Sequence, residues 1–522
     1  MPRSLVLAAL MRESVGMTPS LETPHAAVIV VGGGSSGAVV AARLVEAGVS
    51  VILLEAGPDY GPFVDRATAN RTWPSDLLDA HAIALSHDWG FGSGAVPGRE
   101  PWTFERARVI GGCSAHNGAI AAVGHASDYD AWGFAEWRTD VLRPVFATVL
   151  EKMRVRAYQP TEAGPFHARC LSAARASGWR IASDLCDLDA NESFGLETVN
   201  IVDGVRWNTA FAYLDEIRAL TSESGKPRLT VIGGAVVDTV VETVHGVTVH
   251  AIIDGHPAVV SGDRVVLSAG VYGTPAILQR SGIGDPARLV AAGVSCRLEL
   301  PGVGANLHDH PMVHADRRIG PQLQQWLNEA AVAGSLPEEQ TLGKMCSSLA
   351  TDGIFDLHLF PVCASTQTAL TKGNALVEVA CVTPRSRGRV DIVSADPLAA
   401  PTIDHAYLSD PEGHDLAVLR DGLVRAQELL KAPGLAELLG EPVTDTSTDD
   451  AIRRVVAHYY HPVGSCRIGT DDLSVTDPRG KVRGRERMFV ADASLMPQIP
   501  RANTNIPAVV IGERIAAFLL ER

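Results

Sequence analysis

Apolar residues near the start of the chain fall into two short runs with a glycine-rich turn between them. Residues 28–31 are a continuous aliphatic, mostly β-branched run, which is typical of a strand buried on both faces of a parallel sheet. Residues 38–46 have helical propensity, and a second apolar run at 49–54 ends in Glu55. Strand, turn, helix, strand and acid in this order predict a Rossmann-like βαβ unit.

The turn itself carries the first candidate chemistry. Gly32, Gly34 and Gly37 have the G-x-G-x-x-G spacing, in which a missing side chain allows a tight turn and lets the backbone approach a pyrophosphate. The helix that follows offers its N-terminal N–H groups to the phosphates. Glu55 stands about 20 residues further on, where an acid binds ribose hydroxyls and repels the extra phosphate of NADP. The motif alone leaves FAD and NAD open.

Apolar and polar residues alternate further along, which is the pattern of half-buried strands. The alternation predicts short strands at 229–232, 236–241, 247–253 and 264–267. A second turn of small residues, 268–273, follows the last of them and leads into a predicted helix at 274–280. Such a strand-to-helix turn suits a second cofactor contact.

The second half of the chain has another character. Strand-like segments are followed by an amphipathic helix at 413–430, which predicts a sheet-plus-helix lobe. A helix is also predicted from the N-cap Asp128 to Met153, and another closes the chain at 507–520. The predicted class is therefore α/β with an α+β second lobe. The strand-like segments are residues 355–360, 376–383, 388–394 and, near the end, 488–490.

Composition limits the classes of function. A chain of 522 residues is long enough for two or three domains, and a formal charge of −15 argues against nucleic acid and anionic membrane surfaces as partners. The eight cysteines contain no C-x-x-C pair, so we expect no zinc site and a reducing cytoplasm. Residues 1–24 contain one short apolar run and are interpreted as an N-terminal extension, and no segment is apolar enough for a membrane helix.

Several separated blocks, in one order, resemble the glucose–methanol–choline (GMC) oxidoreductase family, and its choline-oxidase-like branch most. The resemblance implies FAD as cofactor and two discontinuous domains: an FAD-binding domain at 25–153, 200–312 and 458–522, and an antiparallel-sheet substrate domain at 154–199 and 313–457. The blocks are the glycine turn, residues 108–117, 268–275 with 281–284, 300–311, 386–388, 461–469, 492–497 and 503–507.

The resemblance also implies a set of cofactor-binding residues. His116 matches the position at which the branch bonds a histidine covalently to the flavin, and we expect either that bond or a hydrogen bond beside the ring. Gly118 departs from the branch, which has a hydroxyl residue there, and no cage of aromatic residues with an acid is recognisable for a quaternary ammonium. The implied residues are Gly32, Gly34, Ser36, Gly37, Glu55, Gly111, Gly112, His116, Asn117, Gly118, Val237, Ala269, Asp492, Ala493, Asn505, Ile506 and Pro507.

Oxidation of an alcohol requires loss of the hydroxyl proton together with a hydride. An alcohol and a histidine differ by about 9.5 pKa units, or about 13 kcal/mol, so a lone imidazole is insufficient and a second donor on the oxygen is needed. The resemblance assigns these roles to His461 as base and Asn505 as amide donor, with flavin N5 as hydride acceptor. We expect pocket walls at Tyr460, His358 and Trp73, and no metal.

The sequence thus predicts FAD-dependent oxidation of a small-molecule alcohol to an aldehyde or ketone, with possible onward oxidation of the aldehyde hydrate to an acid. O2 or another acceptor reoxidises the flavin, and a homodimer is one expected state. Two alternatives stay open: a lyase of the same fold that cleaves cyanohydrins and keeps FAD structurally, and a flavin-binding protein without turnover.

Overall fold

A computed structural model describes residues 23–64, 72–81, 83–93, 101–333, 337–351, 353–364 and 371–521. The predicted N-terminal extension therefore lies outside the described residues, apart from positions 23 and 24. Within the described ranges, no helix is both long and apolar enough to cross a membrane.

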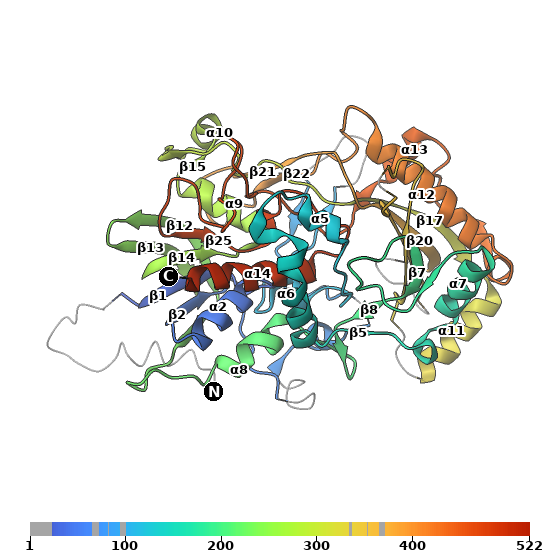
Figure 1. Cartoon of the computed structure of the whole chain (residues 1–522), viewed down its shortest axis with the longest axis horizontal. Coiled ribbons are helices and arrows are strands. Elements are labelled where there is room, and N and C mark those ends of the chain that lie inside the picture. The colour runs from blue at the N-terminus through green and yellow to red at the C-terminus, as the bar shows by residue number, and fades with distance from the viewer. Residues whose placement is uncertain are drawn as a thin grey trace.

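A seven-stranded sheet contains the predicted βαβ unit (Figure 1). Its order is β11-β2-β1-β14-β13-β12, and β25 pairs with β14. The pairs around β1 are parallel, whereas β12, β13 and β14 form an antiparallel meander. The strands are β1 (His25–Val31), β2 (Val51–Leu54), β11 (Leu229–Ile232), β12 (Ala235–Thr243), β13 (Gly246–Ile253), β14 (His256–Leu267) and β25 (Met488–Val490).

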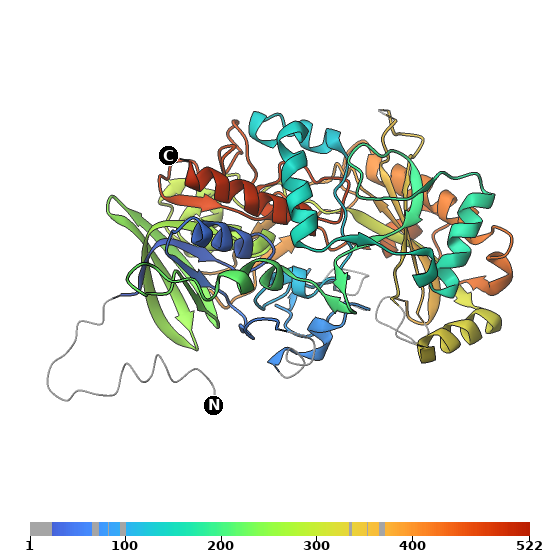
Figure 2. The same ribbon diagram turned by 60° about the horizontal axis from the view of Figure 1, so that its bottom comes forward.

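Two helices from opposite ends of the chain lie side by side against this sheet. Helix α2 (Gly37–Glu46) follows the glycine turn, and α14 (Asn505–Leu520) is the closing helix. They pack closely because Gly512 has no side chain: a Cβ there would lie 2.7 Å from the carbonyl oxygen of Ser36. Figure 2 shows α14 in red alongside α2 in blue. The carboxyl-terminal residues 503–505 are thereby brought to the glycine turn.

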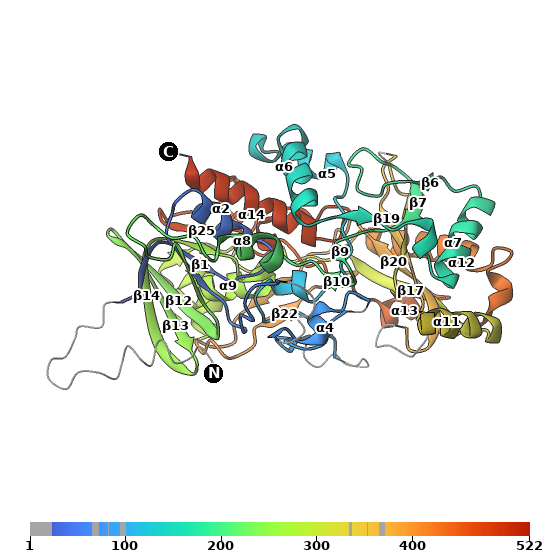
Figure 3. The ribbon, with the colours of Figure 1, turned by 90° about the horizontal axis from the view of Figure 1, so that it is seen from below.

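An eight-stranded, mainly antiparallel sheet organises the second lobe. Helices α7 (Pro165–Ala176), α11 (Pro321–Ala333) and α12 (His414–Leu430) gather at this end of the molecule, far from α2 (Figure 3). The order is β23-β17-β20-β19-β18-β7-β6, and β24 pairs with β17. The strands are β6 (Ile181–Ala182), β7 (Ser193–Leu196), β17 (Pro311–Ile319), β18 (Thr341–Met345), β19 (Leu357–Val362), β20 (Asn374–Cys381), β23 (Leu439–Pro442) and β24 (Ala457–His458).

The remaining elements are short or connect the two sheets. The strands are β3 (Phe91–Gly92), β4 (Thr103–Phe104), β5 (Arg156–Ala157), β8 (Thr198–Val199), β9 (Ile201–Val202), β10 (Val205–Arg206), β15 (Ile283–Gly284), β16 (Leu298–Glu299), β21 (Arg389–Asp391) and β22 (Thr402–Asp404). The α-helices are α4 (Ser75–Leu78), α5 (Ala126–Asp130), α6 (Thr139–Lys152), α8 (Asp215–Ile217), α9 (Gly270–Arg280), α10 (Pro286–Ala291) and α13 (Asp449–Val455).

Several predicted elements need correction. The single helix expected from Asp128 is two helices, α5 and α6, because Gly133 adopts a left-handed φ of 79° and ends the first. His125 is the N-cap of α5, and Asp128 completes its capping box. The expected strand at 388–394 is only β21, which pairs with β22 outside the second-lobe sheet. Strands β17 and β18 and helices α7 and α11 were not predicted.

Candidate active site

A cleft of about 2200 Å³, which includes open solvent, is lined by residues of both large sheets. One end is formed by the glycine turn after β1 and by the end of β2. The other end is formed by Phe360 of β19 and Glu378 of β20. The segment that follows β24 also lines the cleft, with Tyr459, Tyr460 and His461. Segments distant in sequence therefore share one cavity.

The glycine turn is packed as a nucleotide-binding turn requires. A Cβ at Gly32 would clash with the carbonyl of Ser268, and one at Gly37 would clash with the carbonyl of Gly32. These two glycines are needed by the protein's own backbone. Gly34 differs: it lines the cleft, and its Cβ would meet protein only at 3.6 Å, on Gly112 Cα. The space in front of Gly34 is therefore open to a ligand.

Glu55 holds the turn from the end of β2. The backbone N–H of Gly33 donates to its Oε2 and that of Gly57 to its Oε1, both at 2.8 Å. Burial raises the pKa of this carboxyl to about 7, although both hydrogen bonds favour the charged form. Glu55 also lines the cleft, and its role as a ribose-binding acid stays a prediction.

The second small-residue turn closes the cradle from the side. Asp492 accepts hydrogen bonds from the backbone N–H of Gly270 at 2.9 Å and from the hydroxyl of Thr274 at 2.6 Å. It thereby joins the carboxyl-terminal block to the start of α9. Of the other predicted cofactor residues, Ser36, Gly112, Asn117, Gly118, Val237, Ala269 and Ala493 line the cleft, whereas Gly37, Gly111, Ile506 and Pro507 lie behind its wall.

His116 faces the same cleft after a short 3-10 turn, η1 (Gly112–Ala115). Its Nε2 atom is buried and has no hydrogen-bond partner among the described residues. Burial lowers the pKa of the imidazole to about 4, so the ring is neutral at physiological pH. A buried nitrogen with a free lone pair and no protein partner fits a bond to a bound group.

His461 is held in a cluster of buried polar side chains. Its backbone N–H donates to Asp309 Oδ1 at 3.0 Å, and its Nδ1 lies 3.3 Å from Nδ1 of His310. The Tyr459 ring packs edge-on against it, with centroids 4.7 Å apart. Burial, and then the neighbouring His310 and His358, hold the pKa of His461 well below its usual value. The imidazole is therefore neutral, and its Nδ1 faces His310.

Two asparagines at the start of α14 line the cleft, and they differ in their contacts. The hydroxyl of Ser35, in the glycine turn, donates to Asn505 Oδ1 at 2.9 Å, and Asn505 Nδ2 is buried without a partner. Asn503 makes no such bond to the turn, and its Oδ1 is buried without a partner. Asn505, the predicted catalytic amide, is thus attached to the cofactor cradle. Asn503 was not singled out by the sequence analysis.

The three predicted pocket residues separate. Tyr460 lines the cleft, with a left-handed φ of 65° that is strained for a tyrosine, and its carbonyl accepts from Arg106 at 3.0 Å. His358 is corrected: it is fully buried, stacks on Phe355 at 5.9 Å and lies behind Tyr459 rather than in the cleft wall.

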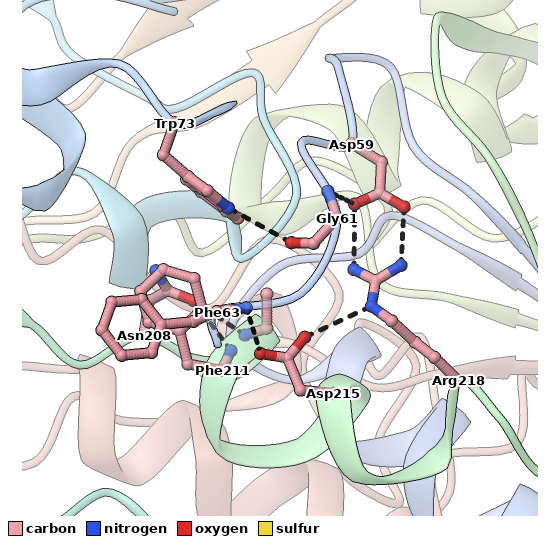
Figure 4. A network of polar contacts seen from close by, with 9 residues as sticks. Asp59, Gly61, Phe63, Trp73, Asn208, Phe211, Asp215 and Arg218 are labelled. Atoms are coloured by element: carbon pink, nitrogen blue, oxygen red, sulfur yellow. Dashed lines mark hydrogen bonds and ion pairs between the residues drawn. The ribbon is translucent and has the colours of Figure 1, made fainter. Parts of the chain in front are cut away.

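Trp73 is also corrected, and Figure 4 shows its surroundings. Its indole N–H donates to the carbonyl of Gly61 at 3.2 Å, and its ring packs against Phe211 at 4.8 Å. The nearby Arg218 forms ion pairs with Asp59 and Asp215. Trp73 is a core residue of the lobe that contains β1 and β2, because the chain after β2 folds back onto the segment around Phe211.

Five charged residues of the cleft wall were missed by the sequence analysis, and one of them is Arg280, the last residue of α9. Glu105 and Arg106 follow β4, whereas Glu339 precedes β18 and Glu378 lies on β20. Glu378 occupies an otherwise apolar strand, NALVEVAC, and this break in the pattern was the available signal. Glu339 lies in a segment for which no strand was predicted, so no pattern indicated that it belongs to the site.

The fold and the cleft define a two-lobed protein whose first lobe has the βαβ unit and glycine turn of a dinucleotide-binding domain. Family models described as GMC oxidoreductase match residues 26–312 and 384–512. Choline oxidase of Arthrobacter globiformis is 31% identical over 94% of this chain and 93% of that protein. Oxygen-dependent choline dehydrogenase of Chromohalobacter salexigens is 30% identical over 92% of each. The structure of pyridoxine 4-oxidase from Mesorbium loti has a TM-score of 0.79 at 26% identity, covering 94% and 98% of the two chains.

The chain therefore belongs to the GMC oxidoreductase family, and its cofactor is FAD. The residues present fit that cofactor. The open space at Gly34, the carboxylate of Glu55 and the unpartnered nitrogens of His116 and Asn505 all face one cleft. The predicted family, fold class and cofactor are confirmed; the residue roles and domain boundaries stay predictions.

Proposed function

We propose that this chain oxidises the CH–OH group of a small-molecule alcohol to an aldehyde or ketone. One observation carries the proposal: a buried, neutral imidazole, that of His461, opens into the same cleft as the nucleotide-binding cradle. When bound, FAD supplies the acceptor for the hydride and passes the electrons on to O2 or another acceptor. The relatives whose names specify an alcohol substrate support this class of reaction.

His461 takes the hydroxyl proton on Nε2. Nδ1 lies against Nδ1 of His310, which leaves Nε2 as the nitrogen available to the substrate. Because burial keeps the ring neutral, the base is in its accepting form without prior deprotonation. The same burial makes it a weak base, so the developing charge on the substrate oxygen needs a second stabilising group. With Nε2 as the acceptor, the neutral ring carries its proton on Nδ1 and donates it to Nδ1 of His310, and the imidazolium keeps this hydrogen bond.

We assign the second group to Asn503 and the cofactor contact to Asn505. The Asn505 carboxamide is bonded to Ser35 in the glycine turn, so its free N–H lies where the cofactor binds. Asn503 lines the cleft and has no bond to that turn. A carboxamide is a fixed donor with no titratable proton in this range, so the base role remains with His461 alone.

His116 is the proposed point of covalent attachment of FAD. Its buried Nε2 has no protein partner, and the lowered pKa keeps the nitrogen unprotonated and nucleophilic.

Anaerobic mixing of the holoenzyme with a panel of alcohols tests the function. Some alcohol should bleach the oxidised-flavin absorbance, and His461→Ala should slow bleaching by about 10²- to 10⁴-fold while FAD content is unchanged. His256→Ala, on an exposed strand position, is the matched control. Bleaching of His461→Ala at the wild-type rate, or a flavin that no alcohol reduces, would contradict the proposal; the second result is what a lyase would give.

A further inference from the structure

Three glutamate carboxyl groups, two of them on buried residues and one on a half-buried residue, meet at the second-lobe end of the cleft. Glu339 and Glu378 line it, and Glu197 lies behind them with no exposed surface. The sheet brings them together: Glu378 is opposite Phe360, Glu339 is bridged to Val362, and the N–H of Glu197 donates to the carbonyl of Gln340. Because Phe360 and Val362 are two positions apart, Glu378 and Glu339 share one face.

Within the part of the chain that the structure describes, these carboxyl groups have no counter-charge. Among the described residues, no hydrogen bond or ion pair reaches the carboxylate of Glu339 or Glu378, and both oxygens of Glu197 are buried without a partner. Burial raises the pKa of Glu378 to about 8, and burial with the other glutamates raises the pKa values of Glu197 and Glu339 well above the usual range. Buried acids are otherwise paired or hydrogen-bonded.

A separate observation also points to a ligand. The Tyr459 hydroxyl is buried without a partner, although a buried tyrosine hydroxyl normally finds one. The Tyr459 side chain lines the cleft and packs against His461. The polar atom that lacks a partner thus lies between the base and the carboxyl groups.

Gly118 makes room for this arrangement. A Cβ at Gly118 would lie 2.9 Å from Oε2 of Glu339. The glycine that departs from the choline-oxidase-like branch is therefore the position against which the Glu339 carboxylate rests. The missing side chain at Gly118 is therefore what leaves room for the Glu339 carboxylate.

We propose that this end of the cleft binds an alcohol that carries two primary or secondary ammonium groups, one facing Glu339 and one facing Glu378. This inference rests on the proposed function for the oxidation of that alcohol, but the binding site stands on its own contacts. The ammonium N–H groups supply the donors that the carboxylates and the Tyr459 hydroxyl lack. The hydroxyl-bearing carbon then lies toward His461.

Other ligands fit less well. A quaternary ammonium has no N–H to donate, so the carboxylate oxygens would stay unsatisfied. A monocation can pair with only one of the two acids that line the cleft and leaves the other without a partner. A single metal ion needs its ligands close together: among the described residues, the side-chain groups whose ligand atoms come within 4.8 Å include none of these glutamates. Two cationic centres match the two glutamate carboxyl groups that line the cleft.

Calorimetric titration of the holoenzyme with putrescine, which has no hydroxyl, tests binding without turnover. Putrescine should bind at least about tenfold more tightly than butylamine or tetramethylammonium, and Glu339→Gln and Glu378→Gln should each weaken it at least about tenfold. Glu441→Gln, an exposed acid on β23 of the same sheet, is the matched control. Equal affinities for the amines, or unchanged binding in both cleft variants, would overturn the site.

Buffers of different ionisation enthalpy add a readout that a structural role would not change. The diamine should release protons from wild-type protein as the carboxyl groups ionise, and Glu378→Gln should release fewer. No release on binding would overturn the proposal.

Kinetics separate this inference from the proposed function. Aminoethylethanolamine should exceed ethanolamine, choline and pentanol in kcat/KM by at least about tenfold, and the glutamine variants should lose this preference. Oxidation of pentanol with indifference to amines would overturn the diamine site and leave the function. Putrescine binding that depends on the two glutamates, together with a flavin that no alcohol reduces, would overturn the proposed function and leave the diamine site.

Discussion

A substitution at Gly34 should affect the binding of FAD without lowering the stability of the fold. In Gly34→Ala, the new methyl group meets protein only at 3.6 Å, an ordinary contact, and Gly34 has no left-handed φ. The apoprotein should therefore be unchanged or more stable by about 0.4–1 kcal/mol, because alanine lowers the entropy of the unfolded chain. The affinity for FAD should fall, since the methyl projects into the cleft where the backbone would approach the pyrophosphate.

The expected loss can be worked from one contact. Displacing a phosphate from a charge-assisted backbone hydrogen bond costs about 1.5–3 kcal/mol, which is about 10- to 150-fold in FAD affinity. Urea unfolding of the apoprotein gives the stability, and FAD titration of the same protein gives the affinity.

Gly178→Ala is the matched control, because Gly178 has a φ of 78° and nothing within 4 Å of its Cβ. It should lose about 1 kcal/mol of stability and keep its FAD affinity. The two variants should thus show opposite patterns. Wild-type FAD affinity in Gly34→Ala would refute the assignment of this space to the cofactor, and so would an equal loss in Gly178→Ala.

Three further results are expected. Asn503→Ala should slow flavin reduction by about 10²-fold at normal FAD content, whereas Asn505→Ala should lose FAD; the opposite pattern in absorbance and stopped-flow measurements would return the catalytic role to Asn505. Acid precipitation should leave the yellow colour in the wild-type pellet and in the supernatant of His116→Ala, and colour in the wild-type supernatant would contradict covalent attachment. Burial raises the pKa of Glu378 to about 8, so the folded protein binds more protons than the unfolded chain between about pH 4.5 and 8. The titratable groups around this carboxyl are Glu197, Glu338, Glu339, Tyr459 and the cross-strand His314. Its contribution to stability is therefore lost as pH rises through that window, and Glu378→Gln should flatten the decline seen in urea unfolding; an unchanged decline would show that another group carries it.

Sequence patterns were sufficient to predict the structure where the residues that determine it lie in one contiguous segment. The strand, the glycine turn, the helix and Glu55 lie within about 30 consecutive residues, the length of a βαβ unit. Their spacing fixes both the local fold and the kind of ligand. The strand at 488–490 and the alternation over 229–267 were likewise readable, since each strand pairs with neighbours of matching pattern. The element ends shifted by a few residues, as for α9 and α14.

Only the tertiary structure decided which residues form the site. Asn503 and Asn505 are equivalent in the sequence, and they differ because α14 packs against α2 and brings Asn505 to Ser35. Trp73 was indistinguishable from a pocket aromatic until the chain folded back onto Phe211. Glu197, Glu339 and Glu378 come from three strand regions, and their meeting depends on sheet register. Sequence determines what a contiguous turn can bind; the surroundings of a side chain depend on contacts between distant segments, which no local pattern encodes.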